Sequence, residues 1–289
     1  MTQKQAQIGV IGGSGLDKFE GLENIEKITV KTPFGNPSAP ITVGDIHGRS
    51  VAFLPRHGTG HTILPTEINV RANVWALKSL GVKQVISVSA VGSLQEKIEP
   101  RHVVIPDQIF DRTRSRVNTF FGEGVVVHIP FADPFCGGMR ALAVKACEEL
   151  GIAHHKSGTY LCMEGPQFST KAESKVYRQW GMDIIGMTAL PEAKLVREAG
   201  MCYVTIALST DYDCWFEGEE AVSVEMVLGN MRHNIGNAKR ILGYIFEHAD
   251  TAADCACHHA LDGAVQTSND HIDWKKHDKY RIFFPEHFK

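Results

Sequence analysis

Two aspartates one residue apart, Asp211 and Asp213, are the residues of this sequence best suited to acid–base chemistry. They follow 202–209, a strongly apolar stretch that predicts a buried strand. Two carboxylates held close together can raise each other's pKa, and a carboxyl group with a raised pKa can keep a proton at neutral pH and donate it. The alternative is that the pair caps a helix beginning near Glu219.

Two further loops carry groups that could bind an anion. Residues 12–15 are Gly-Gly-Ser-Gly after an apolar run, and glycine amides with the Ser14 hydroxyl can form a nest for phosphate. The dinucleotide and Walker fingerprints are incomplete here, so a tight turn is the alternative.

Arg56 and His57 follow a second apolar run. A guanidinium fork matches two phosphate oxygens and an imidazole can donate once more, whereas the alternative is a surface turn.

An aromatic ring completes this set of candidate groups. Phe168 lies within the sequence MEGPQFST, beside a Gly-Pro dipeptide that indicates a loop. An exposed ring there could stack on a flat ligand, and core packing is the alternative. Because ligands of α/β proteins bind at strand ends, these clusters together favour an anion site and an aromatic-ring site at one edge of a sheet.

The elements that must position these residues alternate between strands and helices. Apolar runs predict strands at 7–11, 51–54, 84–90, 158–163, 183–187 and 202–209. Helical spacing with glycine stops predicts helices at about 66–80, 139–150, 171–180, 191–199 and 219–248. Strands that are apolar throughout are typical of a sheet covered on both faces. The sequence therefore predicts a single α/β domain over residues 1–250, with a central mixed β-sheet flanked by helices.

The C-terminal residues 251–289 differ from this domain in composition. Their last part mixes charges with five aromatic residues, which are Trp274, Tyr280, Phe283, Phe284 and Phe288. A solvated tail rarely holds so many aromatic side chains. The segment could pack on its own domain, but we expect it to dock on a neighbouring subunit.

Overall composition limits the classes of function. The 289 residues are 43% hydrophobic and 22% charged, with a formal net charge of −3. This composition is typical of a globular protein and argues against a surface built to bind nucleic acid or an anionic membrane. No apolar run is long enough for a membrane span, and residues 1–7 are too polar for a secretory signal, so we expect a cytoplasmic protein.

The seven cysteines are an odd number scattered along the chain, which is unlike a disulfide scaffold. Their one sequence cluster is Cys255-Ala-Cys257, followed by His258 and His259. Structural zinc usually requires two or more residues between paired cysteines. A vicinal disulfide is therefore favoured over a metal site, and we expect no metal.

Six motifs resemble, in order and spacing, the trimeric purine nucleoside phosphorylase family, and most closely its 5′-methylthioadenosine phosphorylase branch. They are GGSGL, LPRHGTGHTILP, VSAVGSL, MEGPQFST, GMTALPEAKLVREAGMCY and STDYDCW, between about residues 8 and 242. The resemblance implies the nucleoside phosphorylase fold and a homotrimer with sites at subunit interfaces. It also implies a salvage reaction in which inorganic phosphate, as co-substrate, converts methylthioadenosine to adenine and 5-methylthioribose 1-phosphate without metal or organic cofactor.

The same resemblance implies a role for each motif residue. Phosphate would be bound by Ser14, Arg56, His57, Ser89, Ala90 and Thr188. Asp211 would protonate the purine at N7, and Asp213 would bind the exocyclic amine. The nucleoside would contact His61, Phe168, Gly186, Met187, Val224 and Val227, and from a neighbouring subunit His128 and Phe283.

Two alternatives remain open at this point. One is a phosphorylase acting on 6-oxopurine nucleosides or methylthioinosine, because Gly186 is typical of that branch. Asp211 argues for adenine, because the 6-oxopurine branch typically has Asn there. The other alternative is a nucleotide-binding module without catalytic activity.

Overall fold

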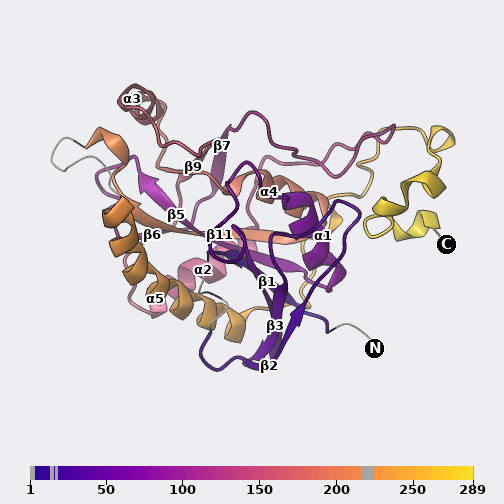
Figure 1. The fold of residues 1–289 in the computed structure, drawn as a ribbon, viewed down its shortest axis with the longest axis horizontal. Helices are drawn as coiled ribbons and strands as arrows, with labels where there is room; N and C mark the ends of the chain where they lie inside the picture. The colour runs from indigo at the N-terminus through magenta and orange to yellow at the C-terminus, as the bar shows by residue number, and fades with distance from the viewer. Residues whose placement is uncertain (1–3, 14–15, 17–18, 217–223, 289) are drawn as a thin grey trace.

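The computed structural model describes residues 4–13, 16, 19–216 and 224–288, with side chains from 229 onward in the last range. Within them, 11 strands form one mixed sheet (Figure 1). Its main path runs β2 (Glu23–Ile28), β3 (Ile41–Ile46), β4 (Arg49–Pro55), β1 (Ile8–Gly12), β5 (Gln84–Ser93), β10 (Ile184–Gly186), β9 (Thr159–Met163) and β7 (Gln108–Arg112). A branch adds β11 (Cys202–Asp211), β6 (Val103–Val104) and β8 (His154–His155).

Four central strands, β4, β1, β5 and β11, run parallel to one another. Their carboxyl ends therefore meet at one edge of the sheet, which is where an α/β fold binds its ligands. Every residue of β1 and of β11 is buried, as apolar strands covered on both faces must be. The register of β11 against β5 shifts between Ser209 and Asp211, so the last residue of β11 lies beside Gly92.

Five α-helices are described: α1 (Val70–Ser79), α2 (Gly137–Glu149), α3 (Lys171–Gln179), α4 (Ala189–Glu198) and α5 (Val224–His248). Helices α2 and α5 pack on each other and on β11, while α1 and α4 pack together in a separate core. Successive residues of β11 enter the two cores in turn: Tyr203 packs with α4 and Val204 with α5. The sheet is thus covered on both faces, and the predicted fold class is confirmed.

The predicted strands and helices all occur, with small differences in their bounds. The expected start of the last helix near Glu219 lies outside the described residues. Sequence patterns did not reveal β2, β3, β6, β7 and β8. Of these, β2 exposes five of its six residues and β6 and β8 have two residues each, so their sequences lack a buried-strand pattern.

The segment after α5 forms short 3-10 turns that extend beyond the main body of the molecule (Figure 1). Its aromatic residues pack on this chain's own Phe120 and Phe121: the Phe283 ring lies 4.6 Å from that of Phe120, and the Phe284 ring 5.4 Å from that of Phe121. In the single chain the segment therefore packs on its own domain. Docking on a neighbouring subunit stays a prediction.

All seven cysteines are free thiols. The vicinal disulfide favoured for Cys255 and Cys257 is therefore wrong for this structure. The described part of the chain contains no helix long and apolar enough to span a membrane.

Candidate active site

A cavity of about 390 Å³ opens at the carboxyl edge of the parallel strands. It is lined by residues at or just beyond the ends of β1, β4, β5, β10 and β11. Eleven of the predicted site residues line it: Arg56, His57, His61, Ser89, Ala90, Phe168, Gly186, Met187, Thr188, Asp211 and Asp213. Motifs separated by more than 150 residues are thus brought to one place.

The other predicted residues lie elsewhere or outside the described part. Ser14 is not described, although its neighbour Gly13 lines the cavity. Val224 and Val227 are at the start of α5, and their side chains are not described; Met231, further along the helix, lines the cavity.

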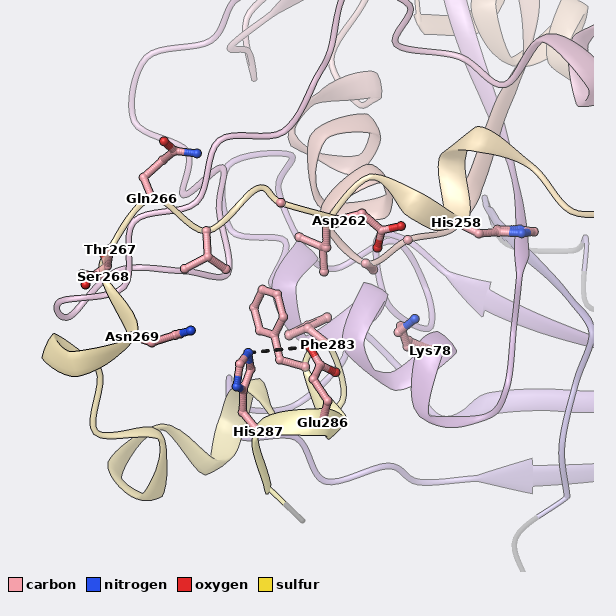
Figure 2. Close-up of a pocket in the computed structure, with 16 residues that line it drawn as sticks. Lys78, His258, Asp262, Gln266, Thr267, Ser268, Asn269, Phe283, Glu286 and His287 are labelled. Atoms are coloured by element: carbon pink, nitrogen blue, oxygen red, sulfur yellow. Dashed lines mark ion pairs between the residues drawn. The ribbon is translucent and has the colours of Figure 1, made fainter.

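His128 and Phe283 do not line this cavity. His128 is exposed on the surface. Phe283 lines a larger cavity of about 630 Å³ between the C-terminal segment and the core (Figure 2). Among the predicted site residues, that larger cavity contains only Phe283. The smaller one is therefore the candidate site, and a role for His128 and Phe283 in a neighbour's site stays a prediction.

Arg56 is held rigidly in the floor of the cavity. Its Nε and Nη2 face the carboxylate of Glu192 as a buried ion pair, and Nη2 also donates to Ser87 Oγ at 2.7 Å. Nη1 donates to the Val88 carbonyl at 3.1 Å. The expectation that the fork of Arg56 would bind two phosphate oxygens is wrong, because Glu192 occupies that edge. A bound anion would lie near Nη1 of the Arg56 guanidinium, which these hydrogen bonds hold in a fixed position.

His57 is neutral in this setting. Burial, followed by the positive charge of Arg56, lowers the pKa of His57 to about 4. Nδ1 lies 2.9 Å from the Ile63 carbonyl, and since a carbonyl oxygen only accepts, Nδ1 carries the hydrogen. Nε2 is then an acceptor, suited to the P–OH group of a monoprotonated phosphate. The expected role of His57 as a donor is corrected to that of an acceptor.

Ser89 and Thr188 supply hydroxyl groups to the same end of the cavity. Both oxygens are buried, and neither makes a hydrogen bond of normal geometry in the described structure, although the Tyr160 hydroxyl lies near both. Buried hydroxyls without partners are costly unless a ligand satisfies them. Thr188 directly precedes α4, whose helical backbone is interrupted at Leu190. These groups and Arg56 therefore fit a phosphate.

Gly186 is explained by its neighbour Tyr160. A Cβ atom at position 186 would lie 2.0 Å from the Tyr160 hydroxyl, so a side chain is excluded while that ring is in place. Packing against Tyr160 therefore explains Gly186, and this glycine does not by itself show whether the substrate carries adenine or a 6-oxopurine.

The two aspartates lie side by side at the other end of the cavity. The backbone N–H of Asp213 donates to Asp211 Oδ1 at 2.8 Å, and Thr210 Oγ1 donates to Asp211 Oδ2 at 2.7 Å. Ser174 Oγ on α3 donates to Asp213 Oδ2 at 2.5 Å. Burial is the main cause that raises the pKa of Asp213 to about 6; the hydrogen bond from Ser174 opposes the rise, and the adjacent Asp211 charge adds to it. The pair can therefore hold a proton near neutral pH.

Gly92 lets this pair approach the sheet. A Cβ atom at Gly92 would lie 2.9 Å from Asp211 Oδ1, closer than a side chain tolerates. Since Gly92 and Ser89 belong to one strand, β5 joins the two ends of the cavity. Three residues of extended chain span about 10 Å.

Apolar groups cover the space between the two ends. Phe168 is 58% exposed, so the core-packing alternative for this ring is wrong. Met187 and Met163 line the same wall. An apolar and aromatic wall with polar groups at its ends is typical of a site for a flat heterocycle joined to a polar group.

Sequence reasoning missed two residues that hold the site in place without lining the cavity. Arg116 is the foremost of them: its Nη1 donates to the carbonyls of Met187 and Leu190 at 2.5 and 2.6 Å, and its Nη2 to that of Glu164 at 2.5 Å. It thus fixes the two loops that carry Met187 and Phe168. Glu192, which follows Pro191 in the first turn of α4, is the other, and neither residue stands out in the sequence by pattern.

Comparisons with known proteins agree with this geometry. A family model described as the phosphorylase superfamily matches residues 7–247. An S-methyl-5′-thioadenosine phosphorylase of Koribacter versatilis is 49% identical, with 98% of this chain and 97% of the relative covered. One of Geobacter sulfurreducens is 53% identical, with 90% and 91% covered.

Solved structures give the same result. A methylthioadenosine phosphorylase from an antarctic soil metagenomic library has a TM-score of 0.90 at 43% identity, covering 97% of this chain and 99% of that one. A methylthioadenosine phosphorylase of Schistosoma mansoni in complex with adenine has a TM-score of 0.83 at 36% identity, covering 91% and 99%. The chain therefore belongs to the phosphorylase superfamily, in the group of enzymes named S-methyl-5′-thioadenosine phosphorylase.

Proposed function

We propose that this enzyme catalyses phosphorolysis of S-methyl-5′-thioadenosine to adenine and 5-methylthioribose 1-phosphate, a step of purine and methionine salvage. The observation that carries the proposal is a single cavity with an anion end and a carboxylate end. Arg56, Ser89 and Thr188 line one end, and the Asp211 and Asp213 pair lines the other. The relatives and solved structures of the same name support this assignment.

At the anion end, phosphate is oriented before it reacts. Thr188 and Ser89 donate hydroxyl hydrogens, the amide of Ala90 donates from β5, and Arg56 supplies positive charge from below. His57 Nε2 accepts the phosphate O–H, which favours a monoprotonated anion. Glu192 keeps the guanidinium from turning toward the substrate. The phosphate oxygens are thereby aimed at C1′ of the sugar.

As the bond from C1′ to the purine breaks, the sugar gains positive charge. The phosphate anion stabilises this oxocarbenium character, and one phosphate oxygen then forms the new bond to C1′. Phosphate is a co-substrate in this proposal, and no metal or organic cofactor takes part in the reaction. Met187 would lie against the sugar, and Phe168 against the purine.

The leaving purine accepts a proton at N7 from the aspartate pair, with Asp211 as the donor and Asp213 toward the exocyclic amine. A carboxylate accepts a hydrogen bond from the amine of adenine. A 6-oxo group in its place would face that carboxylate without a hydrogen to donate. The pair therefore favours adenine nucleosides over 6-oxopurine nucleosides.

The 5′-methylthio group needs an apolar pocket. We place Val224 and Val227 there, with His128 and Phe283 of a neighbouring subunit, and Met231 of this chain lies on the cavity wall nearby. A homotrimer and a cytoplasmic location are part of the proposal. The relatives from Koribacter versatilis and Geobacter sulfurreducens are covered over nearly their full length, which supports carrying the same reaction to this chain.

A substrate panel tests the choice of base. Initial rates are measured with methylthioadenosine, adenosine, inosine and methylthioinosine in phosphate buffer. We expect kcat/KM for methylthioadenosine to exceed that for either 6-oxopurine substrate by at least about 10²-fold, because the latter place an acceptor oxygen against the Asp213 carboxylate where adenine places a donor. Preference for inosine or methylthioinosine would replace this proposal by the 6-oxopurine alternative. Ligand binding without turnover of any substrate would favour a binding module.

A further inference from the structure

Four of the seven cysteines meet at one place outside the candidate active site. The Sγ atoms of Cys136, Cys202, Cys255 and Cys257 all lie within 4.8 Å of one another. All four are thiols, three of them buried and Cys255 partly exposed. They come from three distant segments: the residue before α2, the first residue of β11 and the turn that follows α5.

The spacing of these sulfurs matches a metal site. Zinc binds four thiolates at about 2.3 Å in a tetrahedron, which places neighbouring sulfurs about 3.8 Å apart. The Sγ atoms of Cys136 and Cys255 are 3.7 Å apart. A disulfide bond holds its sulfurs at about 2.0 Å. The short Cys255-Ala-Cys257 spacing, which argues against zinc in the sequence alone, is no obstacle once Cys136 and Cys202 supply the other two ligands.

We propose that Cys136, Cys202, Cys255 and Cys257 form a four-thiolate binding site for one zinc ion. The protein fills all four positions of the tetrahedron, so no position is left for water or substrate. Closed four-cysteine sites are structural. The metal would therefore hold the fold together and take no part in the reaction.

The backbone around the four thiols is already fixed. The N–H of Cys136 donates to the Tyr203 carbonyl at 2.8 Å, and that of Cys202 to the Lys83 carbonyl at 2.9 Å. The N–H of His258 donates to the Cys255 carbonyl at 2.8 Å. The first bond ties the residue before α2 to β11, and the third fixes the turn that carries Cys255 and Cys257, which lowers the cost of ordering the ligands.

The surroundings also compensate the charge of a zinc tetrathiolate, which is about −2. Cys136 precedes the 13-residue helix α2, and the N-terminus of a helix favours negative charge. The Nε2 of His258 lies 3.6 Å from the Cys202 sulfur, within reach of an N–H···S hydrogen bond.

The position of the cluster indicates what the metal stabilises. Cys202 is the first residue of β11 and Asp211 the last, so about 30 Å of strand separates the cluster from the aspartate pair. Cys255 and Cys257 begin the C-terminal segment. Zinc would therefore pin the start of residues 251–289 to α2 and β11.

Metal content of the unmodified chain is the primary test. The full-length protein is purified under reducing conditions, stripped of metal, given one equivalent of zinc, dialysed and analysed by mass spectrometry for metals. We expect about one zinc ion per chain and a higher Tm than that of the stripped protein. Zinc below about a tenth of an equivalent, or a Cys255–Cys257 disulfide in the peptide map of the untreated protein, would overturn the proposal.

Matched variants locate the metal. Cys255→Ala removes the most exposed ligand and should lose nearly all bound zinc, whereas Cys147→Ala removes a buried thiol outside the cluster and should keep it. Equal zinc in both variants would contradict the assignment. If Cys255→Ala does not fold, cobalt in the unmodified chain reports the same site: intense absorption of tetrahedral cobalt thiolate is expected, and its absence would contradict a four-thiolate site.

Discussion

The two aspartates at the end of β11 are equivalent in type but not in surroundings. Asp211 accepts hydrogen bonds from Thr210 and from the Asp213 backbone, whereas Asp213 accepts one from Ser174, and burial raises the pKa of Asp213 to about 6. Two adjacent carboxyl groups of which one has a raised pKa can share one proton near neutral pH. In a coupled pair, the proton belongs to both residues until variants assign it.

Replacing Asp211 tests its role as the proton donor. Asp211→Ala should lower turnover of methylthioadenosine by about 10²- to 10⁴-fold, the usual contribution of a general acid. Asp211→Asn should lose less on inosine than on methylthioadenosine, because a carboxamide can donate to a 6-oxo group. Rates are compared with those of Asp270→Asn, which changes an exposed carboxylate outside the cavity. Wild-type turnover by Asp211→Ala would refute the role.

The unpaired hydroxyl of Thr188 gives a sharper test of the phosphate end. Thr188→Val should raise the KM for phosphate by about 10- to 100-fold, because hydrogen bonds to a charged ligand contribute about 1.5–3 kcal/mol. Stability should change little, since the hydroxyl makes no hydrogen bond of normal geometry in the described structure. Thr205→Val is the control: its hydroxyl is also buried without a hydrogen bond of normal geometry in the described structure, but Thr205 does not line the cavity. Equal phosphate kinetics in the two variants would count against the assignment.

At the scale of elements, the site depends on how loops are fixed to the sheet. Arg116 bridges the loop after β9 and the loop after β10 through three short hydrogen bonds to carbonyls. Arg56 is fixed in the same way by Glu192 of α4, 136 residues away in sequence. The catalytic geometry thus rests on side chains that themselves need not touch the substrate.

Arg116→Lys tests this arrangement. A single ammonium group cannot reach the carbonyls of both loops, so we expect kcat/KM for methylthioadenosine to fall by about 10- to 100-fold together with a lower Tm. Arg114→Lys, a change at a neighbouring exposed arginine, serves as the control. Steady-state kinetics and thermal unfolding are measured on both. Unchanged kinetics in Arg116→Lys would show that the loops keep their positions without the guanidinium.

Glu198, at the end of α4, makes stability depend on pH. Burial raises its pKa to about 7 from 4.5, although the Phe120 amide and the Thr119 hydroxyl donate to it. Between about pH 4.5 and pH 7, Glu198 therefore keeps its proton in the folded state but has lost it in the unfolded state. The contribution of Glu198 to the free energy of unfolding is fully present below about pH 4.5. It is lost as pH rises through about 7, which lowers the free energy of unfolding by roughly 3 kcal/mol.

The variant Glu198→Gln removes this titration. The Tm of the unmodified protein should fall relative to that of Glu198→Gln between about pH 5 and pH 8. Glu247→Gln changes an exposed glutamate of α5 and should keep the pH dependence of the unmodified protein. Parallel Tm profiles for Glu198→Gln and the unmodified protein would contradict the assignment.

Over the whole molecule, the sequence predicted what local patterns can encode. The apolar runs of β1 and β11 and the glycine stops after α1 and α3 place the main elements, and the strand ends place Arg56, Phe168 and Asp211 near one another. Strand β2 was missed because an exposed edge strand has no buried face. Contacts such as Arg56 with Glu192, or the four cysteines, join distant segments and follow only from the folded sheet.

The C-terminal segment carries a prediction about assembly. Phe283→Ala and Phe284→Ala remove rings from the same aromatic cluster, and each should cost about 3–5 kcal/mol of stability. If Phe283 completes a neighbour's site, only Phe283→Ala raises the KM for methylthioadenosine, and the KM for phosphate is unchanged in both. Identical kinetics of the two variants would place Phe283 in packing alone.

The central claim is that one cavity uses phosphate to cleave a nucleoside. The most direct measurement is product analysis after incubation of methylthioadenosine with and without inorganic phosphate. We predict equal amounts of adenine and 5-methylthioribose 1-phosphate when phosphate is present, and no cleavage when it is absent. Adenine released at the same rate without phosphate, together with free methylthioribose, would show hydrolysis and contradict this account.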